Sequence, residues 1–119
     1  MKPRPYTAAE RHLLCREDSL PEGAARGFCI DTRDGPLAVL LLRRDGRCRA
    51  YVNRCPHTGV NLDWVPDRFW DGSGDYLQCA THDALFRPRD GFCVHGPCTG
   101  RSLQALTVYR RRGQLGIIL

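Results

Sequence analysis

Alternating apolar and polar side chains run along much of the chain, a pattern that is typical of β-strands with one buried face. Residues 27–33 (GFCIDTR) alternate in this way. Residues 36–54 contain two apolar runs joined at Asp45-Gly46, a dipeptide that favours a two-residue hairpin turn. Residues 103–119 predict another hairpin, which turns near Gly113. The pattern therefore predicts an antiparallel, all-β domain that is rich in hairpins.

The middle of the chain has shorter runs of the same kind. Residues 75–80 (DYLQCA) and 84–88 (ALFRP) predict two short strands, and Asp90-Gly91 predicts a turn after them. A single short helix is predicted over residues 7–14 (TAAERHLL), where Thr7 followed by Glu10 matches a capping box.

Length and composition limit the classes of protein to which the chain can belong. Its 119 residues are enough for one domain with a modest core. The longest apolar run, residues 37–42, is far shorter than the ~18–20 residues that cross a membrane. The first residues also lack the apolar stretch of a secretory signal. We therefore expect a cytoplasmic protein without a membrane partner.

The chain is basic, with a net charge of +5, and 17 of its 18 basic residues are Arg. These residues are scattered, except at Arg110, Arg111 and Arg112, and no nucleic-acid-binding motif accompanies them. The pattern favours a solvated basic surface, with an acidic protein partner as the alternative. No nucleic-acid partner is expected.

Seven cysteines stand out in a chain that is expected to be cytoplasmic, where thiols and metal ligands are commoner than disulfides. Two short segments each combine a cysteine with a histidine. Cys55 and His57 lie in RCPHTG, and Cys79 and His82 lie in LQCATHDALF. Two thiolates and two imidazoles suit either a tetrahedral zinc or an iron–sulfur centre in which two histidines replace two cysteines on one iron.

The mixed composition of each segment favours the iron–sulfur centre. Structural zinc sites usually draw a cysteine pair from one segment and a second pair from another. Here each segment carries one ligand of each kind. Two loops that clamp a two-iron centre from opposite sides would need this arrangement, because each loop then sends one ligand to each iron.

The two segments resemble the cluster loops of the Rieske [2Fe–2S] domain family. CPHTG resembles the first loop, and CATHDALFRPRDGFCVHGPC resembles the second loop with the turn and Gly-Pro segment that follow it. The resemblance extends over roughly residues 13–119. It implies a Rieske-type antiparallel β-sandwich over residues 1–119, with an inserted cluster-binding subdomain at roughly 53–98.

The resemblance also implies the ligand set. Cys55 and Cys79 would bind one iron through sulfur, and His57 and His82 would bind the other through a ring nitrogen. Gly96-Pro97 would form a third loop that shields the cluster. Two neutral imidazoles in place of two thiolates raise the reduction potential above that of an all-cysteine cluster.

Four positions depart from the Rieske proteins of respiratory and photosynthetic complexes. Val60 and Thr81 stand where those proteins have a pair of disulfide-bonded cysteines. Ala84 and Phe86 replace the Ser and Tyr hydroxyls that donate hydrogen bonds to the cluster sulfurs. Because such hydrogen bonds raise the potential, we predict a low-potential centre, near the roughly −150 mV lower end of the Rieske range.

Two further departures concern the loops. Asp83 occupies a position that is usually glycine, which raises the question of whether the backbone there has a positive φ. The connection between the two motifs is longer than usual around residues 65–75, and its Phe69 and Trp70 are predicted to pack beneath the loop. A partner-docking ridge is the alternative for these aromatic residues.

The remaining cysteines and histidines receive no ligand role. Cys93 is interpreted as a small buried residue and Cys98 as a spare thiol, while a disulfide between them is not favoured in a cytoplasmic chain. His95 is predicted to be an exposed loop residue.

The function that this sequence favours is one-electron transfer, with a [2Fe–2S] cluster as the cofactor. A small carrier would take an electron from a reductase and pass it to an oxygenase or another terminal oxidoreductase. No residue set suggests substrate chemistry of its own. The alternatives are a non-catalytic subunit of a larger oxidoreductase, of the nitrite-reductase small-subunit type, and a zinc-stabilised interaction module.

Overall fold

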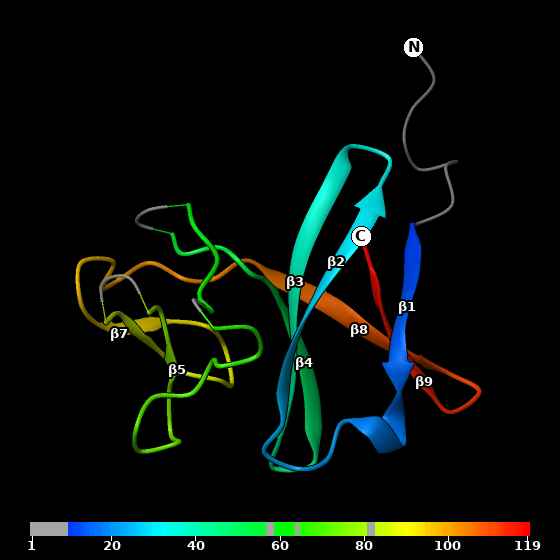
Figure 1. Cartoon of the computed structure of the whole chain (residues 1–119), viewed down its shortest axis with the longest axis horizontal. Coiled ribbons are helices and arrows are strands. Elements are labelled where there is room, and N and C mark those ends of the chain that lie inside the picture. The colour runs from blue at the N-terminus through cyan, green and yellow to red at the C-terminus, as the bar shows by residue number, and fades with distance from the viewer. Residues whose placement is uncertain (1–9, 57–58, 64, 81–82) are drawn as a thin grey trace.

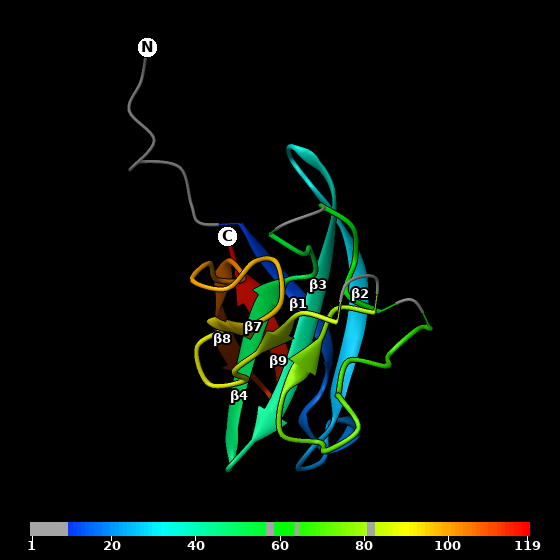
Figure 2. The ribbon, with the colours of Figure 1, turned by 90° about the vertical axis from the view of Figure 1, so that its left-hand side faces the viewer.

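The computed structural model describes residues 10–56, 59–63, 65–80 and 83–119. Six strands form an antiparallel sheet in the order β1-β9-β8-β4-β3-β2. A separate three-stranded antiparallel sheet, β5-β6-β7, lies to one side of it (Figures 1 and 2). The strands are β1 (Arg11–Arg16), β2 (Ala25–Thr32), β3 (Gly35–Arg44), β4 (Arg47–Val52), β5 (Leu77–Gln78), β6 (Leu85–Phe86), β7 (Cys93–His95), β8 (Ala105–Arg111) and β9 (Gln114–Ile118). The antiparallel all-β prediction is confirmed.

The predicted hairpin turns are confirmed by their backbone geometry. Asp45 and Gly46 have φ values of 54° and 74°, and the flanking Arg44 and Arg47 pair across the β3–β4 hairpin. Two successive positive φ values are the signature of the turn that best matches the twist of antiparallel strands. Arg112 (φ 50°) and Gly113 (φ 76°) repeat this geometry between β8 and β9.

Strand β3 is apolar throughout its middle because both of its faces are buried. Successive side chains of a strand point to opposite faces. Val39 and Leu41 contact one hydrophobic cluster, which we call the sheet core, and Leu40 and Leu42 contact a second, the loop core. The sheet core comprises Leu20, Val39, Leu41, Ala50, Leu115 and Ile117. The loop core comprises Ala25, Leu40, Leu42, Tyr51, Cys55, Leu62, Phe69, Leu77, Cys79, Ala84, Phe86, Cys93, Cys98 and Leu103.

The helix predicted over residues 7–14 is wrong. Residues 11–14 belong to β1, which pairs with β9, while residues 7–9 lie outside the described part of the chain. The Glu10 carboxylate accepts hydrogen bonds from the backbone N–H and the guanidinium of Arg33 instead of capping a helix. Pairing with the edge of β9 therefore stabilises residues 11–14 as a strand more than their weak local preference stabilises a helix.

Across the described ranges, the single helix is the three-residue 3-10 turn Glu17–Ser19. None of these residues belongs to a helix with the length and apolar character that crossing a membrane requires.

Candidate metal centre

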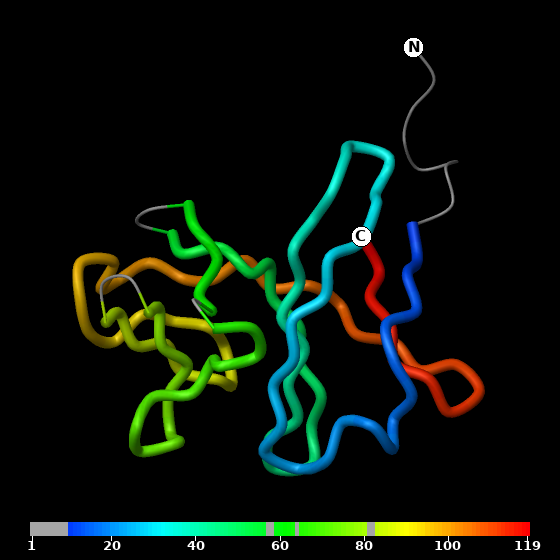
Figure 3. The backbone as a smooth tube through the Cα atoms, viewed as in Figure 1, coloured from blue at the N-terminus to red at the C-terminus, as the bar shows by residue number. Residues whose placement is uncertain are grey.

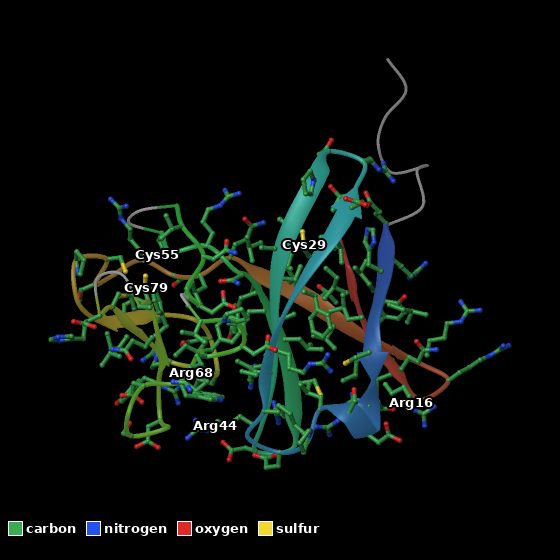
Figure 4. The ribbon with its side chains drawn as sticks, viewed as in Figure 1. Arg16, Cys29, Arg44, Cys55, Arg68 and Cys79 are labelled. Atoms are coloured by element: carbon green, nitrogen blue, oxygen red, sulfur yellow. The ribbon has the colours of Figure 1, made fainter. Side chains whose placement is uncertain are left out.

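Three loops converge at the end of the molecule that carries the smaller sheet (Figure 3). We call residues 53–62 the first loop, 79–84 the second loop and 93–101 the third loop. Cys55 of the first loop and Cys79 of the second are both fully buried in the loop core. Figure 4 shows these two side chains together at this end, whereas Cys29 lies apart on β2. The two predicted histidine ligands, His57 and His82, lie outside the described residues.

The first and second loops fold alike around their cysteines. The backbone N–H of Cys55 donates to the Val60 carbonyl (2.7 Å), and the Gly59 N–H donates back to the Cys55 carbonyl (2.8 Å). In the second loop the Cys79 N–H donates to the Ala84 carbonyl (2.9 Å), and the Asp83 N–H donates to the Cys79 carbonyl (2.9 Å). The same two bonds, at the same spacing, therefore hold each cysteine in an equivalent turn.

The shared turn explains why glycine is favoured four residues after each cysteine. Gly59 has a φ of 76° and Asp83 has a φ of 56°, so both occupy the left-handed region. Asp is one of the few residues with a side chain that tolerate this conformation. The Asp83 carboxylate accepts a hydrogen bond from the Gln78 amide (3.2 Å). The positive φ at position 83 is therefore met by aspartate in place of glycine.

Direct contacts join the three loops to one another. The Ala80 N–H of the second loop donates to the Leu62 carbonyl of the first (3.0 Å). Arg101 donates from Nη1 to the Pro56 carbonyl (3.2 Å), which connects the third loop to the first. Gly96 packs so closely on Ala84 that a Cβ at residue 96 would lie 2.8 Å from the Ala84 Cα. The third loop therefore lies directly against the second, and this contact requires glycine.

The positions that lack the expected hydroxyls are filled by buried apolar groups. Ala84 and Phe86 are both fully buried in the loop core. No hydroxyl oxygen stands at either position to donate towards the buried sulfurs. Asp83 precedes Ala84 in the chain, and its carboxylate is exposed. It accepts a hydrogen bond from the Gln78 amide.

Cys93 and Cys98 of the third loop belong to the same buried group. Their sulfur atoms are 3.1 Å apart, and both side chains are buried. Burial, followed by the neighbouring sulfurs of Cys93 and Cys55, raises the pKa of Cys98 to about 12. The burial predicted for Cys93 is confirmed, and Cys98 turns out to lie beside a predicted ligand. His95, as predicted, is exposed.

The long connection over residues 65–75 packs as predicted. Phe69 is fully buried in the loop core, and Trp70 packs against it while the Arg44 guanidinium covers its ring at 5.0 Å. Asp67 fastens the connection to β2 by accepting the Gly27 N–H (2.7 Å). The Phe69 ring also packs closely on Gly27, because a Cβ at residue 27 would lie 3.3 Å from it. These contacts make the aromatic pair part of the core.

A basic pocket of about 440 Å³ lies where β4 and its hairpin meet the smaller region. Two Asp residues, Asp45 and Asp75, line it together with five Arg, and Asp75 pairs with the Arg44 guanidinium at 3.2 Å. The arginines are Arg44, Arg47, Arg49, Arg87 and Arg89. This grouping could not be predicted from local pattern, because its residues come from two separate segments, 44–49 and 75–89, that meet only in the fold.

The residues present fit a [2Fe–2S] group that takes two cysteines and two further donors. Two buried thiols sit in equivalent turns, and apolar side chains cover them. Within the described ranges no three Cys, His, Asp or Glu side chains gather as a metal site. His57 and His82, the two further donors that the sequence predicted, lie outside these ranges.

Comparison with known families agrees with this geometry. The model of the Rieske [2Fe-2S] domain matches residues 10–110, which is most of the chain. The chain belongs to the Rieske [2Fe-2S] domain family, and its cofactor is a [2Fe–2S] cluster and not a structural zinc.

The similar proteins are parts of oxygenase systems. The chain is 35% identical over 81 residues to the oxygenase component of chloroacetanilide N-alkylformylase from Rhizorhabdus wittichii, a match covering 61% of this chain and 22% of that protein. It also resembles the terminal oxygenase of carbazole 1,9a-dioxygenase from Novosphingobium sp. KA1 (TM-score 0.73, 22% identity, 92% of this chain and 30% of that one). The chain thus spans less than a third of the length of these proteins.

A second similar structure is a chain of comparable length. It comes from a complex of reduced oxygenase and oxidized ferredoxin in carbazole 1,9a-dioxygenase, and the match has a TM-score of 0.70 at 20% identity. It covers 91% of this chain and 92% of that one. At this level of identity the likeness establishes the fold, which extends over nearly the whole of both chains.

Proposed function

We propose that Cys55, His57, Cys79 and His82 hold the [2Fe–2S] cluster, with the cysteines on one iron and the histidines on the other. The observation that carries this proposal is the pair of equivalent turns around two buried cysteines, each with a histidine two or three residues further on. The cluster-binding subdomain is then the region of roughly residues 53–98 that contains the first two loops and most of the third. When bound, the cluster supplies reversible one-electron transfer.

The whole chain then acts as a one-electron carrier in an oxygenase system. It receives an electron from a reductase and passes it to an oxygenase or another oxidoreductase. The full-length likeness to a chain of an oxygenase–ferredoxin complex supports this role. We propose a cytoplasmic location for this carrier, a reducing compartment in which cysteines are kept as thiols or metal ligands.

The protein's own residues favour a low reduction potential. Ala84 and Phe86 surround the sulfur-rich centre with apolar groups and supply no hydroxyl donor. A centre that lacks those donors lies near the lower end of the Rieske range, at about −150 mV. A redox titration tests this value, and a midpoint well above zero would contradict it.

The pocket lined by arginines supports an acidic partner surface. Its five Arg against two Asp leave a positive field beside the smaller region. Such a field speeds the encounter with an acidic protein and weakens as salt screens it. We expect the second-order rate of electron transfer to a partner to fall as ionic strength rises.

The alternative function is a cluster-bearing part of a larger oxidoreductase, such as a non-catalytic subunit of the nitrite-reductase type. The observation that favours it is that the similar oxygenases are more than three times as long as this chain. Purification from the native cell separates the alternatives, because a subunit co-purifies with its large partner and a free carrier does not.

The ligand assignment is tested by iron analysis and EPR spectroscopy of the reduced protein. We expect about two irons per chain and a rhombic Rieske signal. His57→Ala and His82→Ala should each abolish the signal. His95→Ala and His12→Ala are matched controls from the same chain and should keep it. A signal that survives either of the first two substitutions would overturn the assignment.

A further inference from the structure

The third loop places two buried sulfur atoms within reach of each other. Cys93 Sγ and Cys98 Sγ are 3.1 Å apart, and the side chains are 0% and 1% exposed. A disulfide bond has a sulfur–sulfur distance of about 2.05 Å. A movement of about 1 Å therefore separates the two thiols from a covalent bond.

The backbone of the third loop holds the two residues in this relation. The Cys93 N–H donates to the Arg101 carbonyl (2.8 Å), and the Gly100 N–H donates to the Cys93 carbonyl (3.2 Å). The Arg101 N–H donates to the Cys98 carbonyl (2.9 Å). Backbone hydrogen bonds to Arg101 thus hold both cysteines, and they keep the two sulfur atoms close together.

The pair lies beside the proposed cluster ligands but belongs to neither cluster loop. Cys98 contacts Cys55, and the loop that connects Cys93 to Cys98 packs through Gly96 on Ala84 of the second loop. A bond across the third loop therefore braces the segment that covers the two cysteine turns.

We propose that Cys93 and Cys98 are a modification site, a dithiol that closes reversibly into a disulfide through exchange with a small-molecule disulfide of the glutathione type. One cysteine sulfur attacks the reagent and forms a mixed disulfide, which releases one thiol. The second cysteine displaces the other. The pair loses two electrons and two protons, and the reagent gains them as two thiols. In a reducing compartment, such a bond is a transient response to oxidation.

Burial sets the rate of this exchange. The sulfur atoms are covered, although Val94, His95 and Pro97 of the same loop are exposed. The reagent therefore reaches the pair when the third loop opens locally. The bond forms slowly and, once closed, is shielded from reductants in the same way.

The test uses the iron-loaded chain and oxidised glutathione, with air excluded. Trypsin cleaves after Arg89 and Arg101, so one peptide, DGFCVHGPCTGR (90–101), contains both cysteines and no others. After the remaining thiols are alkylated, we expect this peptide at a mass two hydrogens below the dithiol form and without alkyl groups. Dithiothreitol should restore two alkylatable thiols.

A peptide that is still doubly alkylated after an incubation many times longer than the one that fully glutathionylates Cys29 in the same sample would overturn the proposal. So would glutathione retained on Cys93 or Cys98, since an exchange partner 3.1 Å away should displace it. Cys29 is the matched internal control because it is exposed on β2 and lies apart from Cys55, the residue that Cys98 contacts.

Three variants sharpen the result. Cys93→Ser and Cys98→Ser should each stop the loss of two hydrogens, and Cys29→Ser should leave it unchanged. If the first two variants fail to fold, the wild-type peptide measurement still decides the proposal. Bracing of the third loop is measured separately, as a several-fold slower loss of iron to a chelator from the disulfide form. Equal rates would overturn the bracing.

The dithiol chemistry and the electron-transfer proposal fail independently. Iron content and EPR are recorded before oxidation, and they decide the ligand assignment alone. A protein that lacks the Rieske signal but closes the disulfide contradicts the proposed ligands and supports the modification site. A protein that shows the Rieske signal but forms no disulfide supports the proposed ligands and contradicts the modification site.

Discussion

The six-stranded sheet and the three-loop region are held together in different ways. The sheet core is made of aliphatic side chains that alternate along strands of five to ten residues. The strands of the smaller sheet are only two or three residues long. The loop core contains four of the seven cysteines, and the loops around it are held by turns and by backbone hydrogen bonds outside the strands. The backbone of the sheet, which we call the scaffold, is therefore paired strand to strand, while that of the loop region is paired mainly through turns and contacts between loops.

Strand β3 connects the two regions, because neighbouring residues on it serve different cores. Leu41 faces the sheet core and Leu40 faces the loop core. Both faces of β3 are buried, one against each core. The strand therefore fixes the orientation of the smaller region on the six-stranded sheet. The comparison teaches that the loop region is anchored on β3 and β4, which supply Leu40, Leu42 and Tyr51 to its core.

Removing the cluster should have the largest effect, and it should separate the two regions. We expect amide-exchange protection around Cys79 and Phe86 to fall by about 100-fold or more, because ligand binding is part of the folding free energy of a small metal-bound region. Protection in β8 and β9 should stay within a few-fold. Hydrogen exchange of iron-loaded and chelated protein measures both. An equal loss in both regions would contradict an independent scaffold.

Truncating neighbouring residues of β3 should weaken one core at a time. Leu41→Ala should lower the free energy of unfolding by about 2–5 kcal/mol, the usual result of a cavity in a packed core. Leu40→Ala should lower the free energy of unfolding by an amount in the same range. Its cavity would lie in the loop core, so we expect the purified variant to contain less iron. Denaturant unfolding and iron analysis of both variants check this. An identical iron content would contradict the division of β3 between two cores.

High pH should weaken the contact between the scaffold and the loop region through Tyr51. Burial raises the pKa of Tyr51 to about 12, and its hydroxyl donates to the Pro88 carbonyl at 2.7 Å. The unfolded chain loses this proton near pH 10. The folded protein therefore binds more protons between pH 10 and 12, and its stability falls as pH rises through this window.

The Tyr51→Phe variant isolates that effect. It should be less stable at neutral pH by about 1 kcal/mol, because a hydrogen bond is lost, and its alkaline slope should be shallower. Unfolding curves from pH 8 to 12 measure both quantities. The Tyr109→Phe variant, at a partly buried tyrosine of β8, is the control and should keep the wild-type slope. A Tyr51→Phe slope equal to that of wild type would contradict the assignment.

The smallest effect should come from the position four residues after each cysteine. Asp83→Gly should stabilise the second loop by up to about 1 kcal/mol, because glycine adopts a positive φ without strain. Gly59→Ala should destabilise the first loop by a similar amount, although its Cβ would meet no atom within 4 Å. Thermal unfolding compares the two. Effects of the same sign would contradict the equivalence of the two turns.

Much of the scaffold could be predicted from local pattern. Asp45-Gly46 and Gly113 marked two hairpin turns because their positive φ values restrict the residue types that fit. The alternation in residues 27–33 marked β2. The helix expected at residues 7–14 failed because β1 is decided by the open edge of β9, more than 100 positions away. No local signal can report that a distant strand lacks a partner.

The candidate site divides in the same way. The cysteine–histidine spacing alone pointed to the chemistry of the cluster, and the family match agrees. The proximity of Cys93 and Cys98, and of both to Cys55, could not be predicted, because a spacing of five residues is compatible with many loop shapes. The same holds for the pocket of arginines, whose members come from β3, β4 and the turn after β6.

By itself, the sequence determined the all-β class, the hairpin turns and the two cysteine–histidine segments, since each depends on residues within a few positions of one another. The tertiary structure decided which sulfur atoms lie in contact and which face of β3 packs in which core. It also decided that Asp83 adopts the positive φ that glycine usually provides. The physical reason is range. Backbone preference and ligand chemistry act through neighbours in the chain, whereas burial and sulfur–sulfur contact act through neighbours in space.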